Sequence, residues 1–212
     1  MSRPADAPAV EPELARFARP VRWVHGLTGV LVLVCLATAL VLYTSSLAVL
    51  VGHRTVVEQL HVWCGFALPV PLLAGLVSAS YRADLRRLDR FTAADRRWLR
   101  SRTRRSDGLP VGKFNAGQKL NGALSAGAIA VLLVSGTLMY YTGLVSVTYR
   151  TGATFVHDWT ALGLGLLVAG HVTFALRDPV AMRGMRTGTV PHSWAEREHP
   201  EWAAEPVDQQ TP

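Results

Sequence analysis

The sequence is poor in cysteine and in acidic residues. It holds two cysteines, Cys35 and Cys64, in 212 residues, and 15 Asp and Glu against 22 Lys and Arg. A disulfide framework needs more thiols at shorter spacings, and an iron–sulfur cluster needs about four. The chain also lacks a glycine-rich nucleotide loop and any nucleic-acid recognition motif beside its basic residues. We therefore expect no substrate oxidation by this chain alone, and we expect its basic residues to meet membrane lipids rather than nucleic acid.

The apolar residues come in long blocks. Half of the chain is hydrophobic, and four blocks of roughly 20 residues are each long enough to cross about 30 Å of hydrocarbon. Every block contains Gly, Ser or Thr, which are common where membrane helices pack closely. The first block has no cleavage site after it and is too long for a signal peptide. The sequence predicts an all-α integral membrane protein, a four-transmembrane-helix bundle with spans at about 23–43, 61–80, 120–141 and 155–176.

The basic residues are unevenly distributed between these spans. The connection at 81–119 holds 12 of the 22 Lys and Arg residues, and all the others except Arg54 and Arg150 lie in the terminal segments. The positive-inside rule then places both termini of this multi-pass protein in the cytoplasm. The predicted organisation is a flexible N-terminal tail at 1–15, one membrane domain at 16–186 and a cytoplasmic tail at 187–212.

Four of the seven histidines lie in the predicted spans: His25, His61, His157 and His171. Any one of them alone is equally well explained as a neutral imidazole bonded to a neighbouring helix, but ionisable residues in spans are uncommon and mark functional sites. The predicted topology places His25 and His171 near the inner face, and the other two near the outer face. On the fourth helix, a spacing of 14 residues corresponds to about 21 Å and returns to nearly the same face.

Two facing imidazoles at one depth are what a six-coordinate b-type haem requires. We therefore expect two haem b groups, an outer one held by His61 and His157 and an inner one held by His25 and His171. Zinc is disfavoured because it needs ligands that converge on one point. The residue four positions after each histidine is small, which leaves room for a flat porphyrin: Gly29, Gly65, Ala161 and Ala175.

Two arginines precede the first of these histidines. Arg19 and Arg22 lie just before His25 and are suited to pair with haem propionates. Contact with lipid headgroups explains them equally well at this point.

Several segments resemble the cytochrome b (gamma) subunit of membrane-bound formate dehydrogenases, a dihaem cytochrome b561-like family. The resemblance covers nearly the whole chain and includes the spacing of His157 and His171. The segments are RPVRWVHGLTG, EQLHVWCGFAL, GKFNAGQKLN and VPHSWAEREHPEW. The resemblance implies a subunit of an oxidoreductase complex that passes electrons from an iron–sulfur subunit through two haems to a quinone, with menaquinone expected. A molybdenum or tungsten formate dehydrogenase subunit would be the catalytic partner.

Among the segments that carry the resemblance, GKFNAGQKLN is the most distinctive. It opens the third predicted helix at the depth of the inner haem, where a quinone headgroup needs hydrogen-bond donors. The structural interpretation is a helix start, with Asn115 as N-cap and Lys119 extending to lipid headgroups. The functional interpretation is a quinone site bordered by Asn115, Gly117, Gln118, Lys119 and His171.

Two other functions fit the same pattern less well. One is a haem-b anchor for a different dehydrogenase or a hydrogenase. The other is a non-haem membrane anchor or transporter whose histidines bind protons, although no internal repeat or broken helix of the kind that transporters show is evident.

Overall fold

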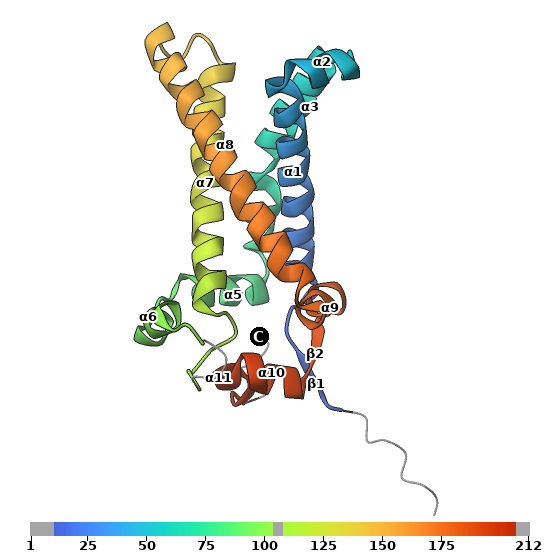
Figure 1. Cartoon of the computed structure of the whole chain (residues 1–212), viewed down its shortest axis with the longest axis vertical. Helices are drawn as coiled ribbons and strands as arrows, with labels where there is room; N and C mark the ends of the chain where they lie inside the picture. Colours follow the sequence, from blue (N-terminus) through green and yellow to red (C-terminus); the bar gives the residue numbers. More distant parts are fainter. Residues whose placement is uncertain (1–10, 104–107, 207–212) are drawn as a thin grey trace, which may run out of the picture.

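A computed structural model describes residues 11–103 and 108–206 of the chain. Residues 1–10, most of the predicted flexible tail, lie outside the described residues. Long helices form an upright bundle, with short helices and a small sheet gathered at one end (Figure 1). Four helices of the described part are long and apolar enough to cross a membrane, so the predicted four-helix membrane fold is confirmed. They are α1 (Arg19–Tyr43), the α3 and α4 pair (Arg54–Ala67 and Pro69–Gly75), α7 (Ala116–Tyr140) and α8 (Val147–Leu176).

These helices begin before the apolar blocks that predicted them. The second one begins at Arg54 rather than near residue 61, because polar residues outside the hydrocarbon continue the same helix. It also ends early, at Gly75. Ser78 then caps a new helix by accepting a hydrogen bond from the Tyr81 backbone N–H, as short polar residues do at helix starts.

The bundle exposes its apolar side chains. Only 6 to 11% of the residues in each apolar window are buried within the chain. Large side chains such as Leu166 and Phe174 are more than two-thirds exposed, which suits a bundle surrounded by lipid tails. A small core of Val32, Leu68 and Leu164 joins α1 and α8 to the junction between α3 and α4.

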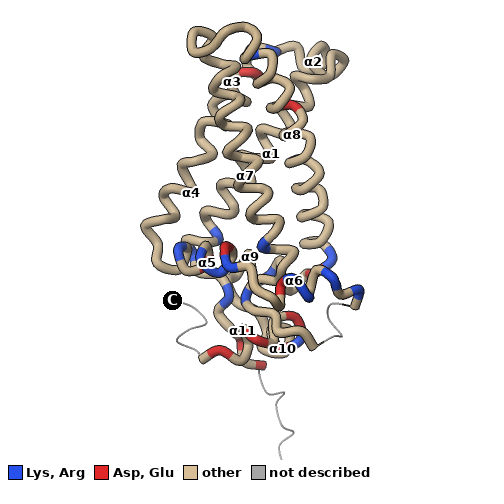
Figure 2. The backbone as a smooth tube through the Cα atoms, turned by 90° about the vertical axis from the view of Figure 1, so that its left-hand side faces the viewer, with Lys and Arg blue, Asp and Glu red and all other residues tan. Residues whose placement is uncertain are grey.

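Charged residues gather at one end of the bundle (Figure 2). We call this the basic end, and the end with α2 (Ser45–Val51) and the starts of α3 and α8 the far end. The remaining elements all lie at the basic end: α5 (Ala79–Asp89), α6 (Ala93–Arg100), α9 (Pro179–Thr187), α10 (His192–Glu198), α11 (Pro200–Ala203), β1 (Glu13–Ala15) and β2 (Thr189–Pro191).

The two terminal segments pair with each other at the basic end. β1 lies antiparallel to β2 with Leu14 opposite Val190, so residues 13–15 form a strand although the sequence assigns them to a loose tail. The tight turn before β2 depends on Gly188, whose φ of +97° suits glycine. An added Cβ there would lie 2.8 Å from the Phe17 carbonyl oxygen.

We call β1, β2, α10 and α11, together with the Arg16 side chain, the terminal cap. Trp194 and Trp202 are buried in its core. The guanidinium of Arg16 is 1% exposed and lies 4.6 Å from the centre of the Trp194 ring, an arrangement typical of cation–π contacts. Burial lowers the pKa of Arg16 to about 10, so its charge remains at neutral pH.

His199 completes the cap as a neutral imidazole. Its Nδ1 lies 2.7 Å from the Gly112 carbonyl oxygen and its Nε2 lies 2.9 Å from Arg16 Nη2. A carbonyl only accepts and a guanidinium only donates, so Nδ1 carries the proton and Nε2 accepts. Burial, together with the neighbouring Arg16 charge, lowers the pKa of His199 to about 3.

The terminal cap should loosen in mild acid. The pKa of His199 is about 3 in the folded cap, whereas its ordinary value is 6.5. Between pH 3 and pH 6.5 the unfolded cap therefore binds one more proton than the folded cap. The stability that His199 contributes is complete above pH 6.5 and declines as the pH falls toward 3. We expect hydrogen exchange at the amides of 189–203 to increase between pH 7 and pH 5, after correction for the intrinsic pH dependence. His199→Gln should lose this increase and His192→Gln, at a more exposed site of the same cap, should keep it; the same increase in both variants would contradict the assignment.

Candidate functional site

The four membrane histidines form two pairs in space. His25 on α1 faces His171 on α8 at the basic end, with ring centres 6.0 Å apart. His61 on α3 faces His157 on α8 at the far end, with ring centres 6.2 Å apart. The structure thus brings together the pairs that the sequence predicts, and α8 supplies one ring to each.

The separation within each pair fits two ligands of one metal ion. Two imidazoles on opposite sides of a metal, each with a metal–nitrogen bond of about 2.0 Å, have ring centres about 6.3 Å apart. A structural zinc ion would need about four protein ligands. In residues 11–103 and 108–206, no group of three or more His, Cys, Asp or Glu side chains is placed to hold a metal. A porphyrin supplies the equatorial ligands itself, so two imidazoles suffice for haem iron.

The far-end histidines are held in place through their second ring nitrogen. His61 Nδ1 lies 2.9 Å from Thr38 Oγ1 and 3.1 Å from the Cys35 carbonyl oxygen, both on α1. His157 Nδ1 lies 3.1 Å from Ser135 Oγ on α7. Histidines that bind metals commonly donate their other N–H in this way, and Nε2 of each ring then remains for a metal. The sequence did not point to Thr38 or Ser135, because single hydroxyls are frequent in membrane helices.

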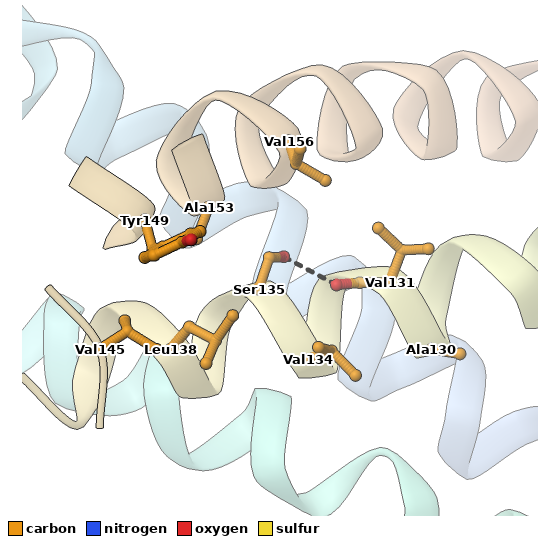
Figure 3. Close-up of a pocket in the computed structure, with 9 residues that line it drawn as sticks. All are labelled: Ala130, Val131, Val134, Ser135, Leu138, Val145, Tyr149, Ala153 and Val156. Atoms are coloured by element: carbon orange, nitrogen blue, oxygen red, sulfur yellow. Dashed lines mark hydrogen bonds between the residues drawn. The ribbon is translucent and has the colours of Figure 1, made fainter. Parts of the chain in front are cut away.

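Ser135 lies at the edge of an apolar cavity between α7 and α8. The cavity has a volume of about 460 Å³ and includes Val131, Tyr149 and Val156 in its lining. Figure 3 shows the Ser135 hydroxyl turned back toward the Val131 carbonyl oxygen, to which it donates over 2.7 Å. The hydroxyl is thereby fixed at the wall of the cavity, next to His157.

Glycines leave space beside the histidine rings. At Gly29 and Gly65, two of the predicted haem neighbours, an added Cβ would meet no atom within 4 Å. Open space next to the helices is what a flat porphyrin requires. Gly136 is different, because an added Cβ would lie 3.2 Å from Cε1 of His157. The sequence gives no sign of the role of Gly136, whose lack of a side chain allows the His157 ring to approach α7. The other two predicted neighbours, Ala161 and Ala175, are half-buried on α8.

The predicted propionate partners line a polar cavity at the basic end. Arg22 Nη1 donates to the Arg186 carbonyl oxygen, which joins the start of α1 to α9. The cavity has a volume of about 470 Å³ and is lined by Arg19, Arg22, Trp23, Met185 and Arg186. Three guanidinium groups around one cavity suit a carboxylate or a phosphate.

Four of the five predicted quinone residues lie at the start of α7 at the basic end, and the fifth, His171, lies on α8. Asn115 caps the helix by accepting from the Gln118 N–H, and Gln118 Oε1 accepts from the Asn115 N–H, both over 2.9 Å. Asn115 is therefore the N-cap that the sequence predicts. The flat ring beside Gly117 in this structure is the Trp98 indole, which an added Cβ would approach to 3.1 Å.

Lys119 is tied to α6 in the same region. Its Nζ lies 2.8 Å from Asp95 Oδ2. Burial alone would raise the pKa of Asp95, but hydrogen bonds from Lys119 and Thr92 outweigh it and hold that pKa below its usual value. Asp95 therefore remains ionised at neutral pH.

A second ion pair made by this motif is buried. Lys113 Nζ lies 2.6 Å from Asp84 Oδ1 on α5, and the side chains are 2% and 5% exposed. Burial raises the pKa of Asp84 and lowers that of Lys113, while their contact favours the charged forms. The motif thus anchors α5 to the start of α7, a function that its sequence did not reveal.

Comparisons with known proteins identify the family of the chain. Residues 16–188 match the family described as prokaryotic cytochrome b561. A region of 99 residues is 31% identical to the formate dehydrogenase cytochrome b556 subunit of Haemophilus influenzae. A region of 98 residues is 30% identical to the cytochrome b556(Fdn) subunit of the nitrate-inducible formate dehydrogenase of Escherichia coli. Each match covers 45% of this chain, and 42% and 45% of the respective relative, so it spans less than half of either relative's length.

The close approach of His157 to Gly136 gives a specific test. Gly136→Leu should displace the ring, because even a Cβ would crowd Cε1, and haem bound per chain should fall by about half in a pyridine haemochrome assay. Gly127→Leu is the matched control on the same helix, since an added Cβ there meets nothing within 4 Å. Equal haem content in the two variants would contradict the role of Gly136.

Proposed function

The chain belongs to the prokaryotic cytochrome b561 family, and on this premise we propose that it is the dihaem membrane subunit of a formate dehydrogenase complex. The family and the four apolar helices establish a multi-pass membrane protein that transfers electrons through haem b. The resemblance to formate dehydrogenase cytochrome b subunits, which the motifs predicted, is confirmed by the relatives. The observation that carries the proposal is the presence of two histidine pairs at opposite ends of one helix.

The histidine pairs would hold one haem each. His61 and His157 would bind iron at the far end, and His25 and His171 at the basic end, each through Nε2. A haem bound there supplies one-electron transfer. The 14-residue step along α8 sets the two sites about 21 Å apart in helix rise, so the helix that carries both rings also fixes their separation.

The arginines of the basic end would bind the propionates of the haem between His25 and His171. Arg19 and Arg22 line the same cavity as Arg186, and His25 lies one helical turn after Arg22. Guanidinium–carboxylate pairs are strong when partly shielded from water. Propionate binding would also neutralise charge that is costly at the hydrocarbon boundary.

The basic end would face the cytoplasm of a bacterium, in the inner membrane. The concentration of Lys and Arg at that end supports this orientation (Figure 2). Electrons would enter at the far end from an iron–sulfur subunit and leave at the basic end. This partner and a molybdenum or tungsten formate-oxidising subunit are inferred from the complexes that the relatives are named for.

A quinone, with menaquinone favoured, would be reduced at the basic end. The proposed site comprises Asn115, Gly117, Gln118, Lys119 and His171. Quinone reduction needs two electrons and two protons, and Lys119 Nζ holds a proton at the start of α7 beside Asp95. Exposed polar atoms near the site also give water access, because the Gln118 side chain is on the surface.

A second candidate is a haem-b anchor for another dehydrogenase or a hydrogenase. It would use the same two histidine pairs. One observation favours it, because the matches to formate dehydrogenase subunits cover less than half of each relative's length. Mass spectrometry of the proteins that copurify with this chain distinguishes the two, since a molybdenum or tungsten subunit supports the first and a nickel subunit the second.

The haem proposal predicts a spectrum and a stoichiometry. The purified protein should show reduced b-type bands and about two haems per chain. His157→Ala and His25→Ala should each remove about one haem, because each leaves a single imidazole at one site. His53→Ala is the control, since His53 begins α3 outside both pairs. A protein without b-type bands would refute the proposal and favour a non-haem anchor or transporter.

The quinone site predicts a selective defect. Asn115→Leu should lower the rate of quinone reduction at least tenfold, in the range seen when a hydrogen-bonding group is lost from a reactive site, and should leave both haems bound. Asn115→Asp separates the two roles of this residue, because aspartate still caps the helix but has no N–H to donate. Normal turnover in Asn115→Asp together with loss in Asn115→Leu would show that only the cap matters and would contradict the quinone role.

A further inference from the structure

Two hydroxyls fix the proton position on the far-end histidines. Thr38 Oγ1 donates to the Val34 carbonyl oxygen and Ser135 Oγ donates to the Val131 carbonyl oxygen, each over 2.7 Å. A hydroxyl has one hydrogen, so while each hydroxyl donates to its backbone carbonyl its oxygen accepts from the facing ring. Both oxygens belong to buried residues, 7% and 4% exposed, so water does not compete for the contact.

The consequence is one tautomer for each far-end ring. His61 donates Nδ1–H to Thr38 Oγ1 and His157 donates Nδ1–H to Ser135 Oγ. The Cys35 carbonyl oxygen accepts from the same His61 nitrogen and reinforces this assignment. The lone pair of each ring therefore lies on Nε2, the atom that a metal between the rings would bind.

The basic-end pair has a different environment. In the parts of the chain that the structure describes, no hydrogen bond is found to the ring of His25 or of His171. Both residues are exposed at the bundle surface, whereas the far-end histidines are half-buried. The two sites therefore share the same ligand type and differ in what supports the ligands.

We propose that Thr38 and Ser135 are positioning residues that give the far-end haem the lower reduction potential of the two. An N–H that donates to an oxygen makes the other ring nitrogen more basic, and a stronger donor stabilises the oxidised, more positively charged iron. With haem bound at both sites, one electron would pass from the far-end site, oxidised in the step, to the basic-end site, reduced in the step, with no proton transferred. The hydroxyls make this direction downhill. The inference rests on the proposed haem function.

The test removes the hydroxyls in the whole purified protein, either by a methyl group of equal size at Thr38 or by deletion at Ser135. Thr38→Val and Ser135→Ala should each raise the lower of the two midpoint potentials and leave the higher one unchanged, as measured by spectroelectrochemical titration. We expect the equilibrium constant for transfer toward the basic end to fall by about three- to tenfold, and tenfold is about 59 mV for one electron. Thr38→Ser keeps the hydroxyl and should restore the original potential.

Thr137→Val is the matched control. Thr137 lies on α7 and also donates to the carbonyl four residues earlier, over 2.7 Å, but it contacts no histidine in the described hydrogen bonds. Unchanged potentials in Thr38→Val and Ser135→Ala, or a shift of the higher potential, would overturn the inference. If haem is lost from Thr38→Val, retention in Thr38→Ser supports the hydroxyl role and loss from both overturns it. Absence of haem from the unsubstituted protein would instead refute the proposed function, so the two failures are distinct.

Discussion

In hydrocarbon, a polar group has no water to bind and must find its partner within the protein. This constraint explains the geometry around the far-end pair. His61 and His157 each lie in a membrane helix, and each ring is satisfied by a buried hydroxyl of a neighbouring helix. The same hydroxyls satisfy their own hydrogen through the backbone. A need for hydrogen-bond partners therefore orients the rings through Nδ1, and Nε2 of each ring is the nitrogen that would bind a metal between them.

The sequence was sufficient for the features that depend on composition and periodicity. Block length predicted the membrane helices, and depth along the helices predicted which histidines face each other, because rise and angle per residue are fixed in an α-helix. The contacts of Thr38, Ser135 and Gly136 could not be predicted, since they depend on how two helices are rotated about their axes. The Lys113–Asp84 pair and the β1–β2 strands join segments far apart in the chain, and no local pattern signals them.

The two ends of the molecule are held together by different kinds of polar contact. At the far end, few charges are present and single neutral hydroxyls support the candidate ligands (Figure 2). At the basic end, buried or half-buried ion pairs hold α5 and α6 against the start of α7. The paired segments lie at the basic end, where most of the charged residues gather. The bundle thus places rigid neutral contacts around one candidate haem and a charged, water-accessible surface beside the other.

The pairing of β1 with β2 also constrains the order of folding. Residues 13–15 precede the first membrane helix, and their partners at 189–191 follow the last one. The strand cannot form until all four helices have been synthesised and inserted, and contacts between such distant segments are slow to form. Arg16 and His199 meet only at that stage. The closed cap therefore joins the two ends of the membrane domain, and the burial of Trp194 and Trp202 within it depends on segments from both sides of the four-helix bundle.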